Sequence, residues 1–154
     1  KYKKWKKVIN LVVNDIESAV NYIKSIVSTA MTPMANKMVE IMQREVNEQI
    51  YADHEPSVYE RTGQMGEIAQ ISSIDMNCAV VEFQDNGDWT SVLTGEHFFP
   101  IIGWEAGKVW SFKSDSTVAY YPPTTIIPDS QVKIAQQIPT ELKRYLIEQG
   151  LDVI

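Results

Sequence analysis

The feature that most constrains this chain is a change in the spacing of its apolar residues near position 63. Before it, apolar residues recur every three or four positions, the period of a helix with one apolar face. The clearest stretch comprises Ile9, Val12, Val13, Ile16, Ala19, Val20, Ile23, Ile26, Val27 and Ala30. After position 63, short runs rich in β-branched and aromatic residues alternate with turn formers. Helices followed by strands predict an α+β fold.

The helical pattern continues to residue 50 with a proline inside it. Thr32-Pro33 predicts a cap followed by a proline in the first turn of a second helix. The spacing is equally compatible with one rod kinked at Pro33, so both arrangements stay open. A methionine stripe at positions 34, 38 and 42 shares a face with other apolar residues, and we expect it to pack in the core or between helices.

Five runs between residues 64 and 121 have the composition of strands. They are "EIAQISSI", "NCAVVEF", "DWTSVL", "KVWSFK" and "TVAYY". Asn86-Gly87 predicts a type I′ turn between two of them, because that turn needs positive φ at both central residues. The segment "KSDST" predicts a second hairpin. We therefore expect an antiparallel sheet of about four to five short strands.

The end of the chain has a helical pattern over residues 130–150. Before it, "YYPPTTIIPD" contains three prolines and predicts a connection, because proline cannot donate to a strand ladder. Pro139 is a candidate break in the helix, and Gly150 is placed to end it. The length suits one domain over residues 1–154. Its expected parts are a basic arm (1–7), a helical segment (8–50), a sheet (64–121) and a C-terminal helix (130–150).

Charge is distributed unevenly along the chain. The net charge is −6, but five of the 14 basic residues fall in the first seven positions, "KYKKWKK". The remainder has 9 basic against 20 acidic residues, a net charge of −11, and is expected to repel nucleic acid. The arm interleaves lysine with aromatics, which is typical of a segment that meets anionic lipid or nucleic acid, or else of a solvated helix start. Its candidate binding residues are Lys3, Lys4, Trp5, Lys6 and Lys7.

The sequence has no recognisable catalytic or metal-binding constellation. Cys78, the only cysteine, lies in "NCAVVEF", and we expect a small buried residue in mid-strand rather than a nucleophile. His54 and His97 have no partner at metal-ligand spacing, and no glycine pattern matches a phosphate-binding loop. No apolar run reaches the roughly 20 residues that a bilayer crossing needs. We therefore predict a protein that is not an enzyme, needs no cofactor and does not engage a membrane.

The segment between helices and strands, "YADHEPSVYERTGQM" (51–65), carries a motif. It resembles the small virion proteins at the head–tail junction of tailed bacteriophages, the neck or tail-completion proteins. Their pattern is a long N-terminal helix, then roughly Tyr-x-x-Tyr-x-Pro-x-x-Tyr-x-Arg-Thr-Gly-x-Leu, then a β-sheet. His54 replaces the second tyrosine and Met65 the leucine, and the resemblance covers about residues 35–70. The matching residues are Tyr51, Pro56, Tyr59, Arg61, Thr62 and Gly63.

The resemblance implies a structural component of the virion that forms or joins a homo-oligomeric ring at the head–tail junction. It implies assembly in the host cytoplasm beside other neck, connector or tail proteins, with DNA passing nearby without sequence-specific binding.

The motif residues themselves predict a joint between helix and sheet. Pro56 stops the helix, Arg61 offers five donors to neighbouring carbonyls, and Gly63 permits a sharp turn. The alternative function is a peripheral binding module that uses the basic arm on membrane or nucleic acid.

Overall fold

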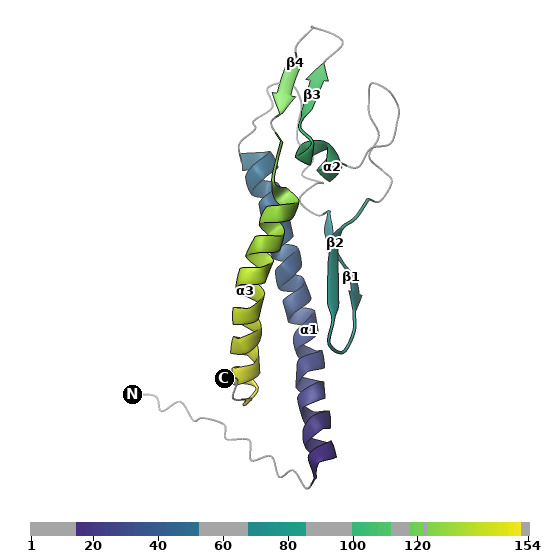
Figure 1. Ribbon diagram of the computed structural model, residues 1–154, viewed down its shortest axis with the longest axis vertical. Helices are drawn as coiled ribbons and strands as arrows, with labels where there is room; N and C mark the ends of the chain where they lie inside the picture. Colours follow the sequence, from purple (N-terminus) through teal and green to yellow (C-terminus); the bar gives the residue numbers. More distant parts are fainter. Residues whose placement is uncertain (1–14, 53–67, 86–99, 112–117, 122, 152–154) are drawn as a thin grey trace, which may run out of the picture.

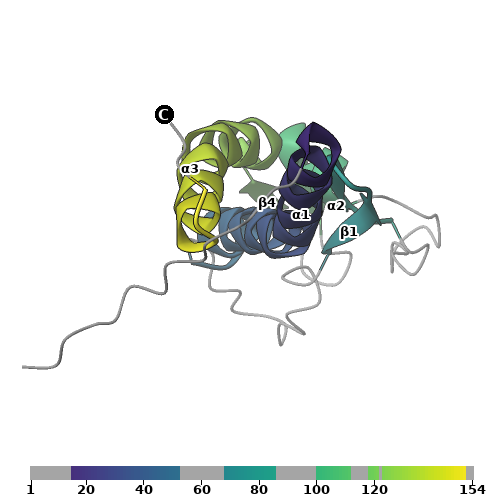
Figure 2. The ribbon, with the colours of Figure 1, turned by 90° about the horizontal axis from the view of Figure 1, so that it is seen from below.

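A computed structural model describes residues 15–52, 68–85, 100–111, 118–121 and 123–151. Its elements are α1 (Ile16–Val46), the π-helix η1 (Asn47–Ala52), β1 (Ala69–Ile74), β2 (Ala79–Phe83), α2 (Pro100–Glu105), β3 (Lys108–Ser111), β4 (Val118–Tyr121) and α3 (Ile126–Glu148). The architecture is α+β, as predicted. The long helix α1 packs against α3 and against the β1–β2 pair, which lie on different sides of it (Figure 1, Figure 2). No helix in the described ranges is both long and apolar enough to cross a bilayer.

Helix α1 is one rod that passes through Pro33. It starts at Asp15, whose carboxylate accepts a hydrogen bond from the Ser18 N–H at 2.7 Å. Thr32-Pro33 therefore does not begin a second helix. A proline inside a helix costs about 3 kcal/mol, because it removes one backbone hydrogen bond and crowds the preceding turn. Burial of apolar residues on both sides of the proline offsets that cost and keeps the rod whole; these residues are Ala30, Met31, Met34 and Ala35.

The strands form two separate antiparallel pairs rather than one sheet. β1 pairs with β2, with a bulge between Ile71 and Ser73, and β3 pairs with β4. For the described residues, the expected sheet of four to five strands is therefore wrong. The helix α2 begins at Pro100, some residues after the segment 88–93 where a further strand was expected, and α1 packs against β1 and β2. The pairing predicted around "KSDST" is confirmed by β3 and β4; "DWTSVL" and the Asn86-Gly87 turn lie outside the described residues.

Cys78 is exposed and lies in the turn between β1 and β2, so its expected burial in mid-strand is wrong. The Asp75 N–H donates to the Cys78 carbonyl at 2.7 Å and closes this turn. β2 begins one residue later, at Ala79. The run "NCAVVEF" has strand composition throughout, but its first two residues belong to the turn.

Helix α3 begins at Ile126, four residues earlier than predicted, and continues past Pro139. Pro128 is tolerated near its start because the first N–H groups of a helix have no partner within it. Gly150, with φ +88°, ends the helix as predicted. The Gly150 N–H donates to the Ile147 carbonyl and the Leu151 N–H to the Leu146 carbonyl, each at 3.0 Å, the pattern of a Schellman motif.

The main core forms where the end of α1 meets α2, α3 and the start of β1. Phe83 and Ile127 pack against its buried residues, which are Val46, Ile50, Ile68, Ile101 and Ile126. In the methionine stripe, Met34 and Met42 are buried, which confirms the expected packing role, while Met38 is half-buried. The helical segment predicted to end at residue 50 reaches Ala52 through η1.

Candidate functional site

A group of polar side chains joins the end of α1 to the start of α3. The Gln49 carboxamide lies at its centre: Oε1 accepts from the Thr125 N–H at 2.9 Å, and Nε2 donates to the Asp129 carboxylate at 3.1 Å. Asp129 also accepts from the Thr125 hydroxyl at 2.6 Å. Glu45 and Lys133 complete the group one turn further along each helix. We call Glu45, Gln49, Thr125, Asp129 and Lys133 the polar clasp.

Glu45 is the buried charge of the polar clasp. Its side chain is 2% exposed, and its Oε1 atom lies 2.5 Å from the Nζ atom of Lys133. Lys133 also reaches Glu48 at 3.4 Å. The hydrogen bond that Lys133 donates to Glu45 raises the pKa of Lys133 above its usual value, against the opposing effect of desolvation. The lysine therefore stays protonated, and its charge makes burial of the carboxylate tolerable.

Glu105, at the end of α2, fixes the start of α3 from another direction. Its Oε1 atom accepts from the Ile127 N–H at 2.6 Å, satisfying one of the first N–H groups of α3. A carboxylate there also complements the positive end of the helix dipole. Thr125, the N-cap residue, makes no capping bond of its own. The position of α3 is thus set by side chains of α1 and α2.

The chemistry of the polar clasp is that of a structural fastening. Its lysine is engaged in ion pairs, and its carboxylates accept hydrogen bonds from fixed donors. In the ranges that the structure describes, no group of three or more His, Cys, Asp or Glu side chains could hold a metal ion. Cys78 lies in the exposed turn between β1 and β2. The clasp therefore holds two helices at a fixed register.

The predicted joint begins just after the polar clasp. Tyr51 lies in η1, and its side chain is outside the described set. The other residues of the motif, Pro56, Tyr59, Arg61, Thr62 and Gly63, lie outside the described residues, as do His54, His97 and the arm residues Lys3, Lys4, Trp5, Lys6 and Lys7. The joint and the arm therefore remain predictions.

Sequence reasoning missed the polar clasp, although one signal for it was present. Glu45 falls on the apolar face of α1, between Ile41 and Val46, both of which are fully buried. A charged residue within a buried stripe needs a partner of opposite charge. The sequence signals that need, but it does not reveal that Lys133, 88 residues away, supplies the partner.

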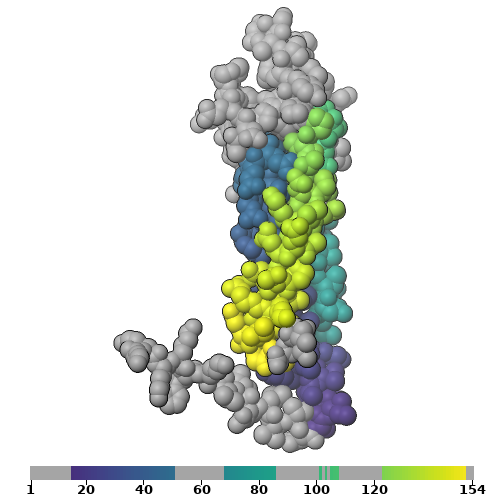
Figure 3. All heavy atoms as spheres, turned by 60° about the vertical axis from the view of Figure 1, so that its left-hand side comes forward, coloured from purple at the N-terminus to yellow at the C-terminus, as the bar shows by residue number. Residues whose placement is uncertain are grey.

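Two groups of apolar residues are exposed at a distance from the main core. Near the start of α1, the exposed fractions are 84% for Ile16, 42% for Val20 and 46% for Ile23. Figure 3 shows this end of α1, in purple, extending beyond the end of α3, in yellow. The other group surrounds the β1–β2 turn and comprises Ile74, Met76 and Val80. Clustered apolar residues on a surface are typical of interaction sites.

The profile of the YomN family matches residues 13–147, which include α1, all of α3 except its last residue, and the whole polar clasp. The chain belongs to the YomN family. YomN proteins are phage-derived, so membership points to a phage origin. No curated protein and no solved structure matches the chain.

Proposed function

We propose that this YomN-family protein is a non-enzymatic structural component of a tailed-phage virion, located at the head–tail junction, where it forms or joins a ring. One observation carries the proposal. A chain of a phage-derived family has, directly after its long helix, the tyrosine–proline–tyrosine–arginine–threonine–glycine order that resembles neck and tail-completion proteins. The proposed partners are further copies of the chain and other neck, connector or tail proteins.

The architecture is compatible with a mechanical role. The polar clasp and the main core lie in the part of the molecule next to Tyr51, where the motif begins. A joint that transmits contacts between subunits needs such a rigid support, because a loosely held interface would lose its geometry. The acidic composition of residues 8–154 suits a passage through which DNA moves without adhering.

The decisive experiment is an amber mutation in this gene in a phage that carries it. Electron microscopy of the lysate should show filled heads and separate tails, or heads that have lost their DNA, because one component of the junction is missing. Expression of the wild-type chain from a plasmid should restore tailed particles. Normal, infectious tailed particles in the unsuppressed lysate would contradict the proposal.

Complementation with variants then tests the motif. Arg61→Ala should fail to restore tailed particles, and Arg61→Lys should restore them only in part, because an ammonium group cannot reproduce the planar fork of guanidinium donors. Cys78→Ser is the matched control, since Cys78 is exposed in the β1–β2 turn, and should complement fully. Full complementation by Arg61→Ala would remove Arg61 from the junction.

The lysines of the first seven residues favour a second candidate, the peripheral binding module. Binding that depends on them should weaken steeply with salt, because it releases counterions from DNA or lipid. We would measure retention on DNA and on anionic vesicles at rising salt, with Lys3, Lys4, Lys6 and Lys7 changed to serine as the comparison. Tight, lysine-dependent binding together with normal particle assembly would favour this candidate.

A further inference from the structure

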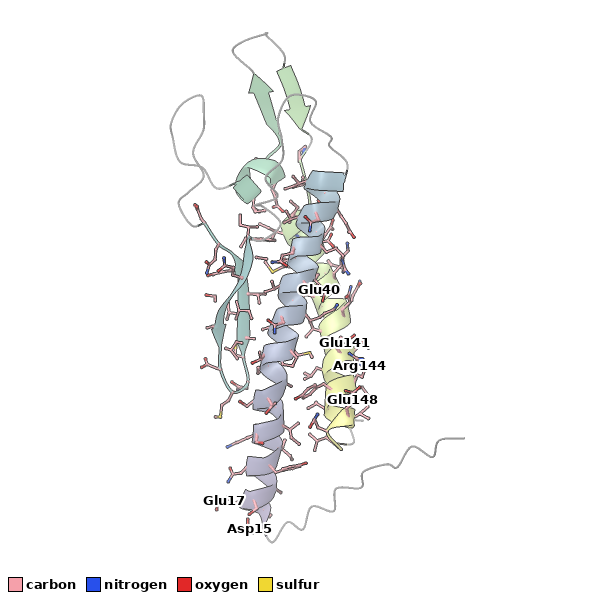
Figure 4. All side chains as sticks on the ribbon, turned by 180° about the vertical axis from the view of Figure 1, so that it is seen from behind. Asp15, Glu17, Glu40, Glu141, Arg144 and Glu148 are labelled. Carbon is pink, nitrogen blue, oxygen red and sulfur yellow. The ribbon has the colours of Figure 1, made fainter. Side chains whose placement is uncertain are left out.

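The polar clasp fixes the register of α1 against α3, and this register leaves part of α1 without a partner. Gln49 contacts Asp129, and one turn away Glu45 contacts Lys133. The two helices are therefore antiparallel, and four residues along α1 correspond to four residues along α3. When the register of these two pairs is extended along both helices, Glu148 at the end of α3 lies level with Ala30 of α1. Everything before Ala30 projects beyond α3, a length of about 20 Å at 1.5 Å per residue. In Figure 4, Asp15 and Glu17 accordingly lie well below Glu148.

The projecting part, residues 16–27, is called the foot of α1. Its apolar residues Ile16, Val20, Ile23 and Val27 alternate steps of four and three, the spacing of a coiled-coil seam. In the sequence, the same steps extend back to Ile9 and Val13 and forward to Ala30. β-Branched residues occupy every position of the seam up to Val27.

The seam lies on the same side of α1 that contacts α3 nearer the C-terminal end of α1. Val27 precedes Glu45 by 18 residues, about five full helical turns, so both project from the same side of the rod. Glu45 is covered there by Lys133 of α3. Below the end of α3 this face is uncovered, and Ile16, Val20 and Ile23 are exposed. The seam thus continues a helix-packing face that the chain itself fills only in its upper part.

We infer that the foot of α1 pairs antiparallel with the foot of a second copy of the chain. Charge selects the partner and its direction. Glu17 and Lys24 are both exposed and lie next to Ile16 and Ile23, on one edge of the seam. They are about two turns apart, too far to pair within one helix. In a parallel pair the two-fold axis places this edge of one copy and the same edge of the other on opposite sides of the seam, so Glu17 and Lys24 could not pair across it.

An antiparallel pair brings opposite charges together twice. When Ile16 packs opposite Val27 of the other copy, Val20 packs opposite Ile23. Glu17 then lies near Lys24 of the other copy, with an offset of about 3 Å along the helix axis. The two-fold symmetry gives a second, identical contact. The second helix also fits by length, because its Asp15 comes level with residue 28, just short of the end of α3. The pairing does not depend on the proposed ring, since it uses the foot and not the joint.

Measurement of mass against concentration tests the pairing. Sedimentation equilibrium of the full chain should show reversible self-association, and Ile23→Asp should raise the dissociation constant at least about tenfold, because it buries an unpaired charge in the seam. Val132→Asp, at an exposed valine position on α3, is the matched control and should leave association unchanged. In dilute protein, where little dimer forms, both variants should keep the wild-type melting temperature. A wild-type chain that does not self-associate at about 1 mM, or an Ile23→Asp variant that associates normally, overturns the inference.

Charge reversal tests the direction. Lys24→Glu should weaken association, and Glu17→Lys combined with Lys24→Glu should restore it, because the pairs are re-formed with exchanged signs. For a direct measure, Cys78 is changed to Ser and single cysteines are placed at residue 16 or residue 27. Ile16→Cys mixed with a longer, tagged Val27→Cys chain should give a disulfide-linked heterodimer. A disulfide dimer of Ile16→Cys with itself, in place of the heterodimer, overturns the antiparallel arrangement.

Discussion

Glu45 shows how one residue sets the relation between two helices. A carboxylate that is 2% exposed within an apolar face would be strongly disfavoured without a counter-charge. Lys133 supplies that charge from α3, and it can do so only when the helices are in one register. The pair therefore favours a single alignment of α1 and α3, which is the best-established use of a buried ion pair.

Removal of the Glu45 carboxylate should destabilise the protein more than removal of an exposed one. We expect Glu45→Ala to lower the free energy of unfolding by about 1–3 kcal/mol, because Lys133 loses its principal acceptor and a gap is left in the face. Glu40, which pairs with Lys37 and is 61% exposed, is the matched control, and its alanine variant should cost at most about 1 kcal/mol. Urea unfolding measures both, and equal costs would show that the clasp contributes no more than a surface pair.

Lys133 also predicts how stability responds to alkaline pH. Its pKa is raised in the folded protein, chiefly by the hydrogen bond that it donates to Glu45. Its contribution is therefore fully present below the pKa of a lysine in the unfolded chain, about 10.4. As pH rises from there through the higher folded-state pKa, the contribution is lost. Urea unfolding of wild type and Lys133→Gln between pH 8 and pH 11.5 should show their difference shrinking above about pH 10. A difference that stays constant would contradict this assignment.

Two glycines with positive φ provide a matched pair of backbone tests. At Gly107 (φ +67°) an added Cβ would come within 2.9 Å of Pro123 Cδ, whereas at Gly150 (φ +88°) it would meet nothing within 4 Å. Alanine at Gly150 should cost about 1–2 kcal/mol for the left-handed conformation alone. Alanine at Gly107 should cost more, because the proline ring must also shift. Thermal unfolding that shows equal losses would exclude a close contact with Pro123.

At the scale of elements, the sequence predicts those that depend on local spacing, because periodicity is a property of neighbouring residues. The three–four pattern predicts α1, the β-branched runs predict β1 to β4, and Gly150 correctly predicts the end of α3. Where elements pair over a distance, local patterns fail. The two separate strand pairs and the α1–α3 clasp depend on contacts between segments far apart in the chain. Pro33 is an intermediate case between local and long-range prediction. The spacing allows one helix or two, and the burial of apolar residues on both sides of the proline decides for one.

The continuity of α1 gives a test of Pro33. Pro33→Ala restores an N–H to the middle of a continuous helix at an exposed position, so we expect the free energy of unfolding to rise by about 1–3 kcal/mol. Pro128→Ala is the control: it lies in the first turn of α3, where no helical bond is regained, and should give no such gain. Chemical unfolding of both variants decides it. No gain at Pro33 would favour two helices that meet at the proline.

At the scale of the whole molecule, the two ends of the α1 rod differ in how far their apolar residues are buried, from fully buried Val46 to Ile16, which is 84% exposed. The main core and the polar clasp lie where α1, α2 and α3 meet, while the foot of α1 extends from the other end of the rod (Figure 1). A helix without tertiary contacts is marginal in water. The ends of the molecule therefore differ in rigidity as well as in chemistry.

Hydrogen exchange should show this gradient. Amide protons of residues 18–24 should exchange much faster than those of residues 38–46 in dilute protein, because opening the foot breaks few contacts. At high concentration the foot should become protected in the wild type and not in Ile23→Asp. Uniform protection along α1 in dilute protein would show that the foot is held by contacts within one chain.

The register of the polar clasp also has a consequence for synthesis of the chain. The hydrogen bond between Gln49 and Asp129 cannot form until Asp129 has been synthesised, 80 residues after Gln49. At ribosomal rates of about 5–20 residues per second, α1 is complete for roughly 4–16 s before its partner helix exists. During that time the β1–β2 pair is the first described element able to cover part of its apolar face. On a polysome, several neighbouring nascent chains therefore expose an unpaired α1 at the same time. The order of elements along the chain sets how long the α1 helices of different chains must be kept from pairing with one another.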